Sequence, residues 1–86
     1  MKKIGDKVKV INTGLTYPLY DTLAKHFKLK RWEKNFLPKI NDVGIVIGIE
    51  DEGHRLIYAV KGNRRDFLIG GEGIEKINSK ITYEYG

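Results

Sequence analysis

Polar and apolar residues alternate near the start of the chain, between residues 6 and 11. Val8 and Val10 share one face of this segment, and a period of two is typical of a half-buried β-strand. Similar apolar runs return at 42–50, 56–60, 66–69 and 74–77, separated by turn residues such as Gly, Asn and Asp. The pattern predicts four or five short strands. Residues 80–85 also alternate, so both an added edge strand and a frayed end remain open there.

The period changes between the first two predicted strands. Apolar residues recur there at helical spacing, at Leu19, Tyr20, Leu23, Ala24 and Phe27. Pro18 is compatible with the first turn of a helix, because its missing N–H would be unpaired in that position. We expect one helix that ends near residue 28 or 29, well before Pro38 closes the segment.

Short strands at turn-punctuated spacing with one helical interruption predict a small antiparallel barrel. Three motifs, Gly-Asp-x-Val-x-Val at 5–10, Asp-Val-Gly-Ile-Val-Ile-Gly-Ile at 42–49 and Glu-Gly-Ile-Glu-Lys-Ile at 72–77, resemble SH3-like barrels related to KOW and Tudor modules. The stretch Gly-Leu-Thr-Tyr-Pro-Leu-Tyr at 14–20, with Leu-Ala-Lys at 23–25 and Trp32, further resembles small uncharacterised phage and prophage proteins. The resemblance implies a mainly β fold with a single SH3-like domain over 1–86. A helical, basic insertion at about 15–39 would replace a short loop, and 78–86 would form a C-terminal tail.

Composition narrows the class of protein. The 86 residues are 41% hydrophobic and 31% charged, which is typical of a globular domain. No apolar stretch approaches the roughly 18 residues of a membrane span, and no apolar run follows the first lysines as in a secretory signal. The chain has no cysteine, which excludes disulfides, thiolate metal sites and thiol nucleophiles. We therefore expect a cytoplasmic protein that does not associate with membranes.

Candidate catalytic and metal-binding residues are sparse. His26 and His54 lack the spacing that places two ligands around one metal ion. The glycine-rich turn at 70–73 lacks the Gly-Lys-Ser/Thr ending of a phosphate-binding loop. Ser79, the only serine, has no histidine nearby in sequence. The sequence therefore predicts no enzyme activity, no metal site and no cofactor.

Charge is distributed unevenly along the chain. Residues 1–41 carry ten Lys and Arg against three acids, and 42–86 carry six against eight, so the two parts have net charges of +7 and −2. A surface polarised in this way favours an anionic partner. The predicted nucleic-acid-binding residues lie in the basic segment and in a later turn: Lys25, Lys28, Lys30, Arg31, Trp32, Lys34, Lys39, Arg64 and Arg65.

Two interpretations of this basic segment remain open. If Trp32 is exposed, it can stack on bases and favour single-stranded nucleic acid. If Trp32 and Phe36 are buried, they anchor the segment to the barrel, and only the cations remain to bind phosphate. The leading hypothesis is a noncatalytic module that binds RNA or single-stranded DNA. The alternative is a protein-interaction module that docks on a host or phage protein, and self-association through 81–85 is a third possibility.

Overall fold

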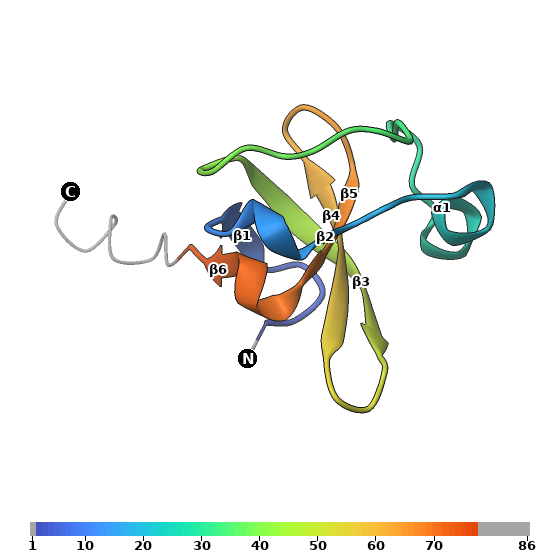
Figure 1. Ribbon diagram of the computed structural model, residues 1–86. Helices are drawn as coiled ribbons and strands as arrows, with labels where there is room; N and C mark the ends of the chain where they lie inside the picture. Colours follow the sequence, from blue (N-terminus) through green and yellow to red (C-terminus); the bar gives the residue numbers. More distant parts are fainter. Residues whose placement is uncertain (1, 78–86) are drawn as a thin grey trace, which may run out of the picture.

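The strands form one antiparallel sheet that curls into a half-barrel (Figure 1). The computed structural model describes residues 2–77, so the predicted strand at 80–85 lies outside the described residues. The strand order is β2-β5-β4-β3-β1-β6. The prediction of a mainly β chain with one helix is confirmed. The strands are β1 (Lys7–Val10), β2 (Thr16–Tyr17), β3 (Val43–Asp51), β4 (Leu56–Gly62), β5 (Phe67–Gly70) and β6 (Ile74–Lys76), joined in part by the 3₁₀ turns η1 (Thr13–Leu15) and η2 (Gly71–Gly73).

Strand β3 is the longest strand and pairs with both β1 and β4. Its register with β4 shifts between Val46 and Gly48, which marks a β-bulge. The sheet edges β2 and β6 do not pair with each other. Backbone bonds beside η1 and η2 instead continue the pairing of β1 with β6. The amides of Ile11 and Asn12 both donate to the carbonyl of Gly73, at 2.9 and 3.2 Å.

Strand β2 is the element that the hydrophobic pattern did not predict. Thr16 and Tyr17 pair with Ile69 and Leu68 of β5. A two-residue strand is too short to show alternation, so only its tertiary pairing reveals it. The predicted insertion at about 15–39 therefore contains a strand near its start. The connection between β2 and β3, residues 18–42, is called the crossover below.

The helix α1 (Asp21–Phe27) lies within the crossover. It begins later than the pattern predicted, because Tyr20 has extended backbone and is the N-cap residue. Tyr20 is 53% exposed and Pro18 lies outside the helix. The predicted end near residue 28 is confirmed: Lys28 adopts a left-handed conformation with φ of 59°, which stops the helix. Among the described residues, no helix is long and apolar enough to cross a membrane.

The two faces of the sheet carry separate apolar clusters. Side chains inside the barrel form the inner cluster: Val8, Val10, Val46, Tyr58, Val60, Phe67, Ile69 and Ile74. The outer cluster lies between the sheet and the crossover, and contains Leu19, Ala24, Leu29, Ile57, Ala59 and Leu68. Successive β4 residues from 57 to 60 alternate between the two clusters, because adjacent side chains in a strand point to opposite faces.

The crossover covers the outer face of the sheet only in part. From α1 it runs back across the sheet to the start of β3 (Figure 1). Trp32 is partly buried against the outer cluster, and Phe36 is partly buried against the inner cluster. The rings of Phe36 and Phe67 lie 6.5 Å apart. Of the two interpretations of these aromatic side chains, their packing favours the anchor.

Candidate functional site

Arg31 ties the crossover to the turn between β4 and β5. Its Nη2 donates to the carbonyl of Gly62 and to Asp66 Oδ1, the latter at 3.2 Å. The backbone amides of Lys30 and Arg31 donate to Asp66 Oδ2, at 3.2 and 3.3 Å. Asp66 is only 3% exposed, and these donors compensate for the burial of its charge. Arg31 is therefore engaged in holding the crossover in place.

Arg64 forms a second tie from the same turn. Its Nη2 donates to Asp42 Oδ2 at 2.6 Å, and its guanidinium lies 5.1 Å from the centre of the Phe36 ring. Burial raises the pKa of Asp42, but it is outweighed by hydrogen bonds from Arg64 and from the Lys39 amide together with the positive charges of both residues. The net pKa lies below its usual 3.8. Asp42 therefore stays ionised and keeps Arg64 paired.

Arg65 makes the third tie, because its Nε donates to Glu33 Oε1 at 2.7 Å. The turn that carries Arg64 and Arg65 thus does lie beside the crossover, as a second nucleic-acid contact would require. Both guanidinium groups, however, are already paired with carboxylates. All three arginines of the predicted site are consequently bound within the protein.

The five lysines of the predicted site are exposed at the surface of the crossover. Within residues 2–77, the structure pairs none of them with a carboxylate. Lys28 and Lys30 face one hollow, and Lys34 faces a different one beside Trp32. Lys25 lies on α1, and Lys39 precedes β3. The arginines and lysines of one basic segment therefore have different roles.

Two adjoining hollows form what we call the basic hollow. The first, of about 330 Å³, is lined by Lys28, Lys30, Arg31, Ile47, Lys61 and Asp66. The second, of about 380 Å³, is lined by Lys7, Arg31, Val43, Gly44, Ile45, Lys61, Gly62 and Asn63. Arg31 and Lys61 line both hollows, so the two hollows lie next to each other.

Strand register explains why Lys7 and Lys61 reach the basic hollow. Both residues are paired with Ile45, Lys7 from β1 and Lys61 from β4. Paired residues of neighbouring strands project from the same face, and adjacent strands lie about 4.8 Å apart. Lys7 and Lys61 therefore flank Ile45 on the outer face. The sequence analysis did not single them out. The polar position of Lys7 in the first predicted strand is a signal that could have found it, whereas Lys61 lies just beyond the predicted strand at 56–60.

The basic hollow has an excess of positive charge. Asp66 is the only acid in its described lining, and the side chain of Arg31 already pairs with it. Lys7, Lys28, Lys30 and Lys61 therefore have no lining carboxylate to neutralise them. Four unneutralised ammonium groups around two adjoining hollows attract anions with several negative charges.

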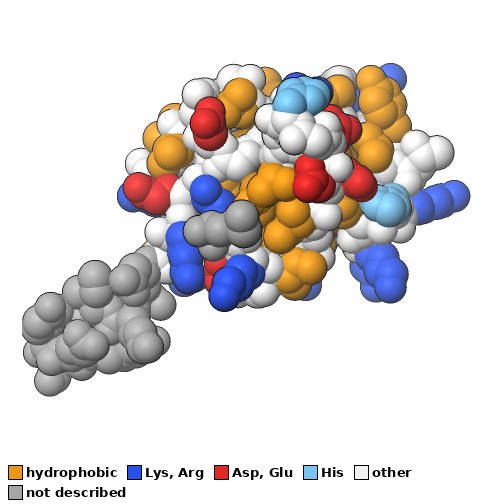
Figure 2. Space-filling view, turned by 90° about the horizontal axis from the view of Figure 1, so that it is seen from below, with side chains coloured by type: hydrophobic (Ala, Val, Ile, Leu, Met, Phe, Trp, Pro, Cys, Tyr) orange, Lys and Arg blue, Asp and Glu red, His pale blue; other side chains and the backbone are white. Residues whose placement is uncertain are grey.

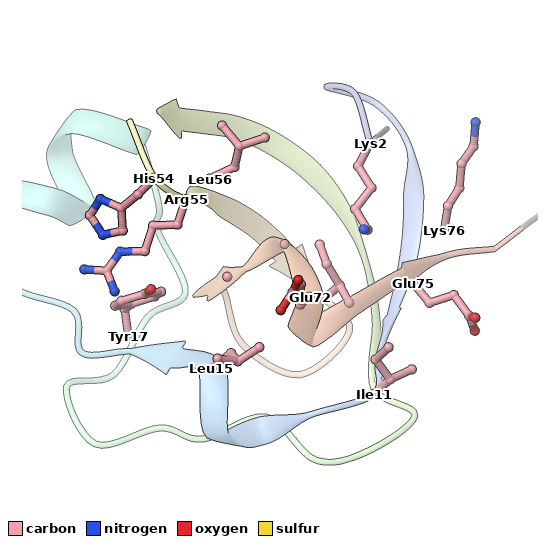
Figure 3. Close-up of a pocket in the computed structure, with 13 residues that line it drawn as sticks. Lys2, Ile11, Leu15, Tyr17, His54, Arg55, Leu56, Glu72, Glu75 and Lys76 are labelled. Carbon is pink, nitrogen blue, oxygen red and sulfur yellow. The ribbon is translucent and has the colours of Figure 1, made fainter. Parts of the chain in front are cut away.

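A larger hollow, of about 760 Å³, has a mixed character (Figure 3). Its charged side chains are of both signs, and several are paired: Glu75 with Lys9 at 3.6 Å, Lys76 with Asp6 at 3.7 Å, and Arg55 with Glu52 at 3.2 Å. The face in Figure 2 likewise exposes hydrophobic side chains among charges of both signs. Neither surface has the single-sign excess of the basic hollow.

Among residues 2–77, no three His, Asp or Glu side chains gather closely enough to hold a metal ion. The comparisons with known proteins add no further assignment. No protein-family model, no curated protein and no solved structure matches this chain.

Proposed function

We propose that this protein is a noncatalytic module that binds nucleic acid through the basic hollow. One observation carries the proposal. Lys7, Lys28, Lys30 and Lys61 come from three separate parts of the chain, yet they line two adjoining hollows whose only acid in the described lining is already paired. Cysteine is absent from the sequence, which agrees with a cytoplasmic location.

The energetics of such a site suit a polyanion. Ammonium groups close together repel one another, and a phosphate backbone that approaches them relieves this repulsion. Each phosphate that a lysine neutralises also releases condensed counterions, so the affinity falls steeply as salt rises. Single phosphates gain little from this effect, whereas a chain of phosphates can contact several lysines at once.

The use of lysine in place of arginine indicates contacts with the backbone of the nucleic acid. Arginine has a planar fork that reads guanine or carboxylate groups in two-point contacts, whereas lysine acts as a flexible point charge. The arginines of this region are engaged with Asp42, Glu33 and Asp66. We therefore expect binding that depends weakly on base sequence.

A fluorescence-anisotropy titration with labelled oligonucleotides at low and high salt tests the proposal. The test variant replaces Lys28, Lys30 and Lys61 with Gln, and the matched control replaces Lys25, Lys34 and Lys39 with Gln. Both lose three positive charges. On single strands, the slope of log affinity against log salt is negative, and we expect its magnitude to be smaller by about 2 in the test variant. Each phosphate contact contributes about 0.7 to this magnitude, and three contacts are lost.

The control variant should keep most of the wild-type slope, because its lysines lie outside the basic hollow. Equal losses in the two variants would assign the effect to overall charge and contradict the proposed site. No binding by the wild-type protein at low salt would contradict the function itself. Circular dichroism of all three proteins checks that the fold is kept.

A protein partner is the second candidate, and exposed apolar residues of the crossover favour it. Leu37 is 65% exposed and Ile40 is 52% exposed, although large apolar side chains gain from burial. These residues would dock on a host or phage protein. Pull-down from a lysate treated with nuclease tests this function, and replacement of Leu37 and Ile40 with Ser should abolish the capture. Capture that requires nucleic acid would contradict it.

A further inference from the structure

We infer that the basic hollow selects single-stranded over double-stranded nucleic acid, because a strip of apolar side chains between its lysines contacts the faces of unpaired bases. The strip consists of Val43, Ile45 and Ile47 on the outer face of β3. This inference rests on the proposed function and specifies which nucleic acid the site takes.

The strip is the part of the outer face that the crossover leaves uncovered. Ile57, Ala59 and Leu68 of the same face are buried beneath α1 and the residues around it. Ile47 packs at the border of this cluster and lines the first hollow, whereas Val43 and Ile45 line the second. The apolar surface therefore continues out of the outer cluster into the basic hollow.

Ile45 is the most exposed member of the strip. Its residue surface is 38% exposed, and its neighbours across the strands are Lys7 and Lys61. Lys28 and Lys30 stand at the Ile47 end. An isoleucine with lysines on both sides offers an apolar contact at the centre and phosphate contacts at the rim.

A duplex cannot use this arrangement. Its bases are paired and stacked inside the helix, so it presents chiefly phosphates and sugars to a protein surface. The strip would then lose water without gaining an apolar partner. A single strand can turn its bases outwards, place their faces on apolar side chains and keep its phosphates near the cations.

The size of the strip favours a nucleic acid over an acidic protein. Stable protein interfaces bury about 800 Å² on each partner, which takes about 20 residues or more. The strip, by contrast, consists of only three side chains. Few apolar contacts flanked by cations suit a ligand in which small planar groups repeat along a charged backbone.

The first arm of the experiment compares three probes by fluorescence anisotropy at low salt. These are a thymidine oligonucleotide, an abasic oligonucleotide with the same number of phosphates, and a duplex of the same length. We expect the thymidine strand to bind several times more tightly than the abasic strand, and more tightly than the duplex for equal phosphate number. An abasic strand that binds equally well, or a duplex that binds better, would overturn the inference.

The second arm uses two matched variants of β3. Ile45→Thr removes apolar surface from the strip, and Ile49→Thr makes the same change at a residue that is also 38% exposed but lies outside the basic hollow. Both positions favour β-branched residues, so both variants should fold. We expect Ile45→Thr to weaken thymidine binding by at least about fourfold, because it removes one methyl group and replaces a methylene with a hydroxyl, with an unchanged salt slope.

The outcomes separate this inference from the proposed function. If Ile45→Thr and Ile49→Thr bind equally well, while the triple lysine variant still loses salt dependence, the inference fails and the proposed function stands. If none of the three probes binds, both fail. A poly-glutamate peptide that binds as tightly as the thymidine strand would overturn the choice of nucleic acid over an acidic protein.

Discussion

The two faces of the sheet differ in how they are covered. The inner face is enclosed by the barrel itself, and its cluster is built almost entirely from strand residues. The outer face depends on the crossover, which supplies Leu19, Ala24 and Leu29 and leaves the region around Ile45 uncovered. The inner face therefore stabilises the fold, whereas the incomplete cover of the outer face creates the basic hollow.

The two coverings also differ in how readily they can adjust. Inner side chains pack between backbone segments that pair with one another, so a cavity or an added atom there is difficult to accommodate. The crossover is held mainly by side-chain packing and by ties such as Arg31 to Asp66, so it can shift to absorb a small change. Matched substitutions on the two faces test this difference.

Truncation of two isoleucines on adjacent strands should show the largest difference in stability between the two faces. Ile69 is fully buried in the inner cluster, and Ile57, 8% exposed, belongs to the outer cluster. Ile69→Ala should lower the free energy of unfolding by about 4 kcal/mol, and Ile57→Ala by about 2 kcal/mol, because the crossover can partly collapse into the cavity. Urea denaturation measures both. Equal losses would show that the crossover is as rigid as the barrel.

Two glycines of β3 allow the opposite test, in which an atom is added. A Cβ at Gly44 would lie 2.7 Å from the backbone oxygen of Lys61, whereas a Cβ at Gly48 would lie 2.7 Å from Cδ1 of Phe27 on α1. Gly44→Ala should cost about 3 kcal/mol, because backbone must move. Gly48→Ala should cost about 1 kcal/mol, because the Phe27 ring can shift. Thermal denaturation of the two variants compares the costs, and a larger loss for Gly48→Ala would contradict the adjustable cover.

The tie between Arg64 and Asp42 should have the smallest effect, and it depends on pH. Because the folded-state pKa of Asp42 lies below the usual 3.8, ionised Asp42 stabilises the fold fully above about pH 5 and progressively less as pH falls through the folded pKa. The pair is partly exposed, so we expect less than about 1 kcal/mol.

Urea denaturation of wild-type protein and Asp42→Asn at several pH values measures this contribution. The difference in stability between the two proteins should be present at pH 7 and shrink in acid. A difference that stays constant down to pH 3 would show that the carboxylate charge of Asp42 does not hold the crossover in place.

The strands and the helix were predictable because local alternation and helical spacing encode them. The predicted first strand and the end of α1 at Phe27 agree with the structure to within about a residue. Strand β2 was not predictable in this way, because Thr16 and Tyr17 become a strand only through their pairing with β5.

The positive charge of the candidate site was predictable from the sequence, but the set of residues that form the site was not. A basic segment at residues 25–39 is evident from the sequence. The carboxylates that pair with its arginine, and with the two arginines of the later turn, are distant in sequence from these arginines. Arg31 and Asp66 are 35 residues apart, and Arg64 and Asp42 are 22 apart. Lys7 and Lys61 join the site only through strand register. Residue types thus showed the sign of the charge on this surface, and tertiary pairing determined which charged side chains are not engaged within the protein.

The two ends of strand β3 lie in surroundings of opposite charge. The basic hollow borders its beginning at Val43 and Ile45, whereas Glu50 and Asp51 lie at its other end. The seven residues from Ile45 to Asp51 span about 20 Å of extended chain, so opposite charges are held apart along one strand. The field of a nearby polyanion would exert a torque on the resulting dipole and turn the lysines of the basic hollow towards the polyanion before contact.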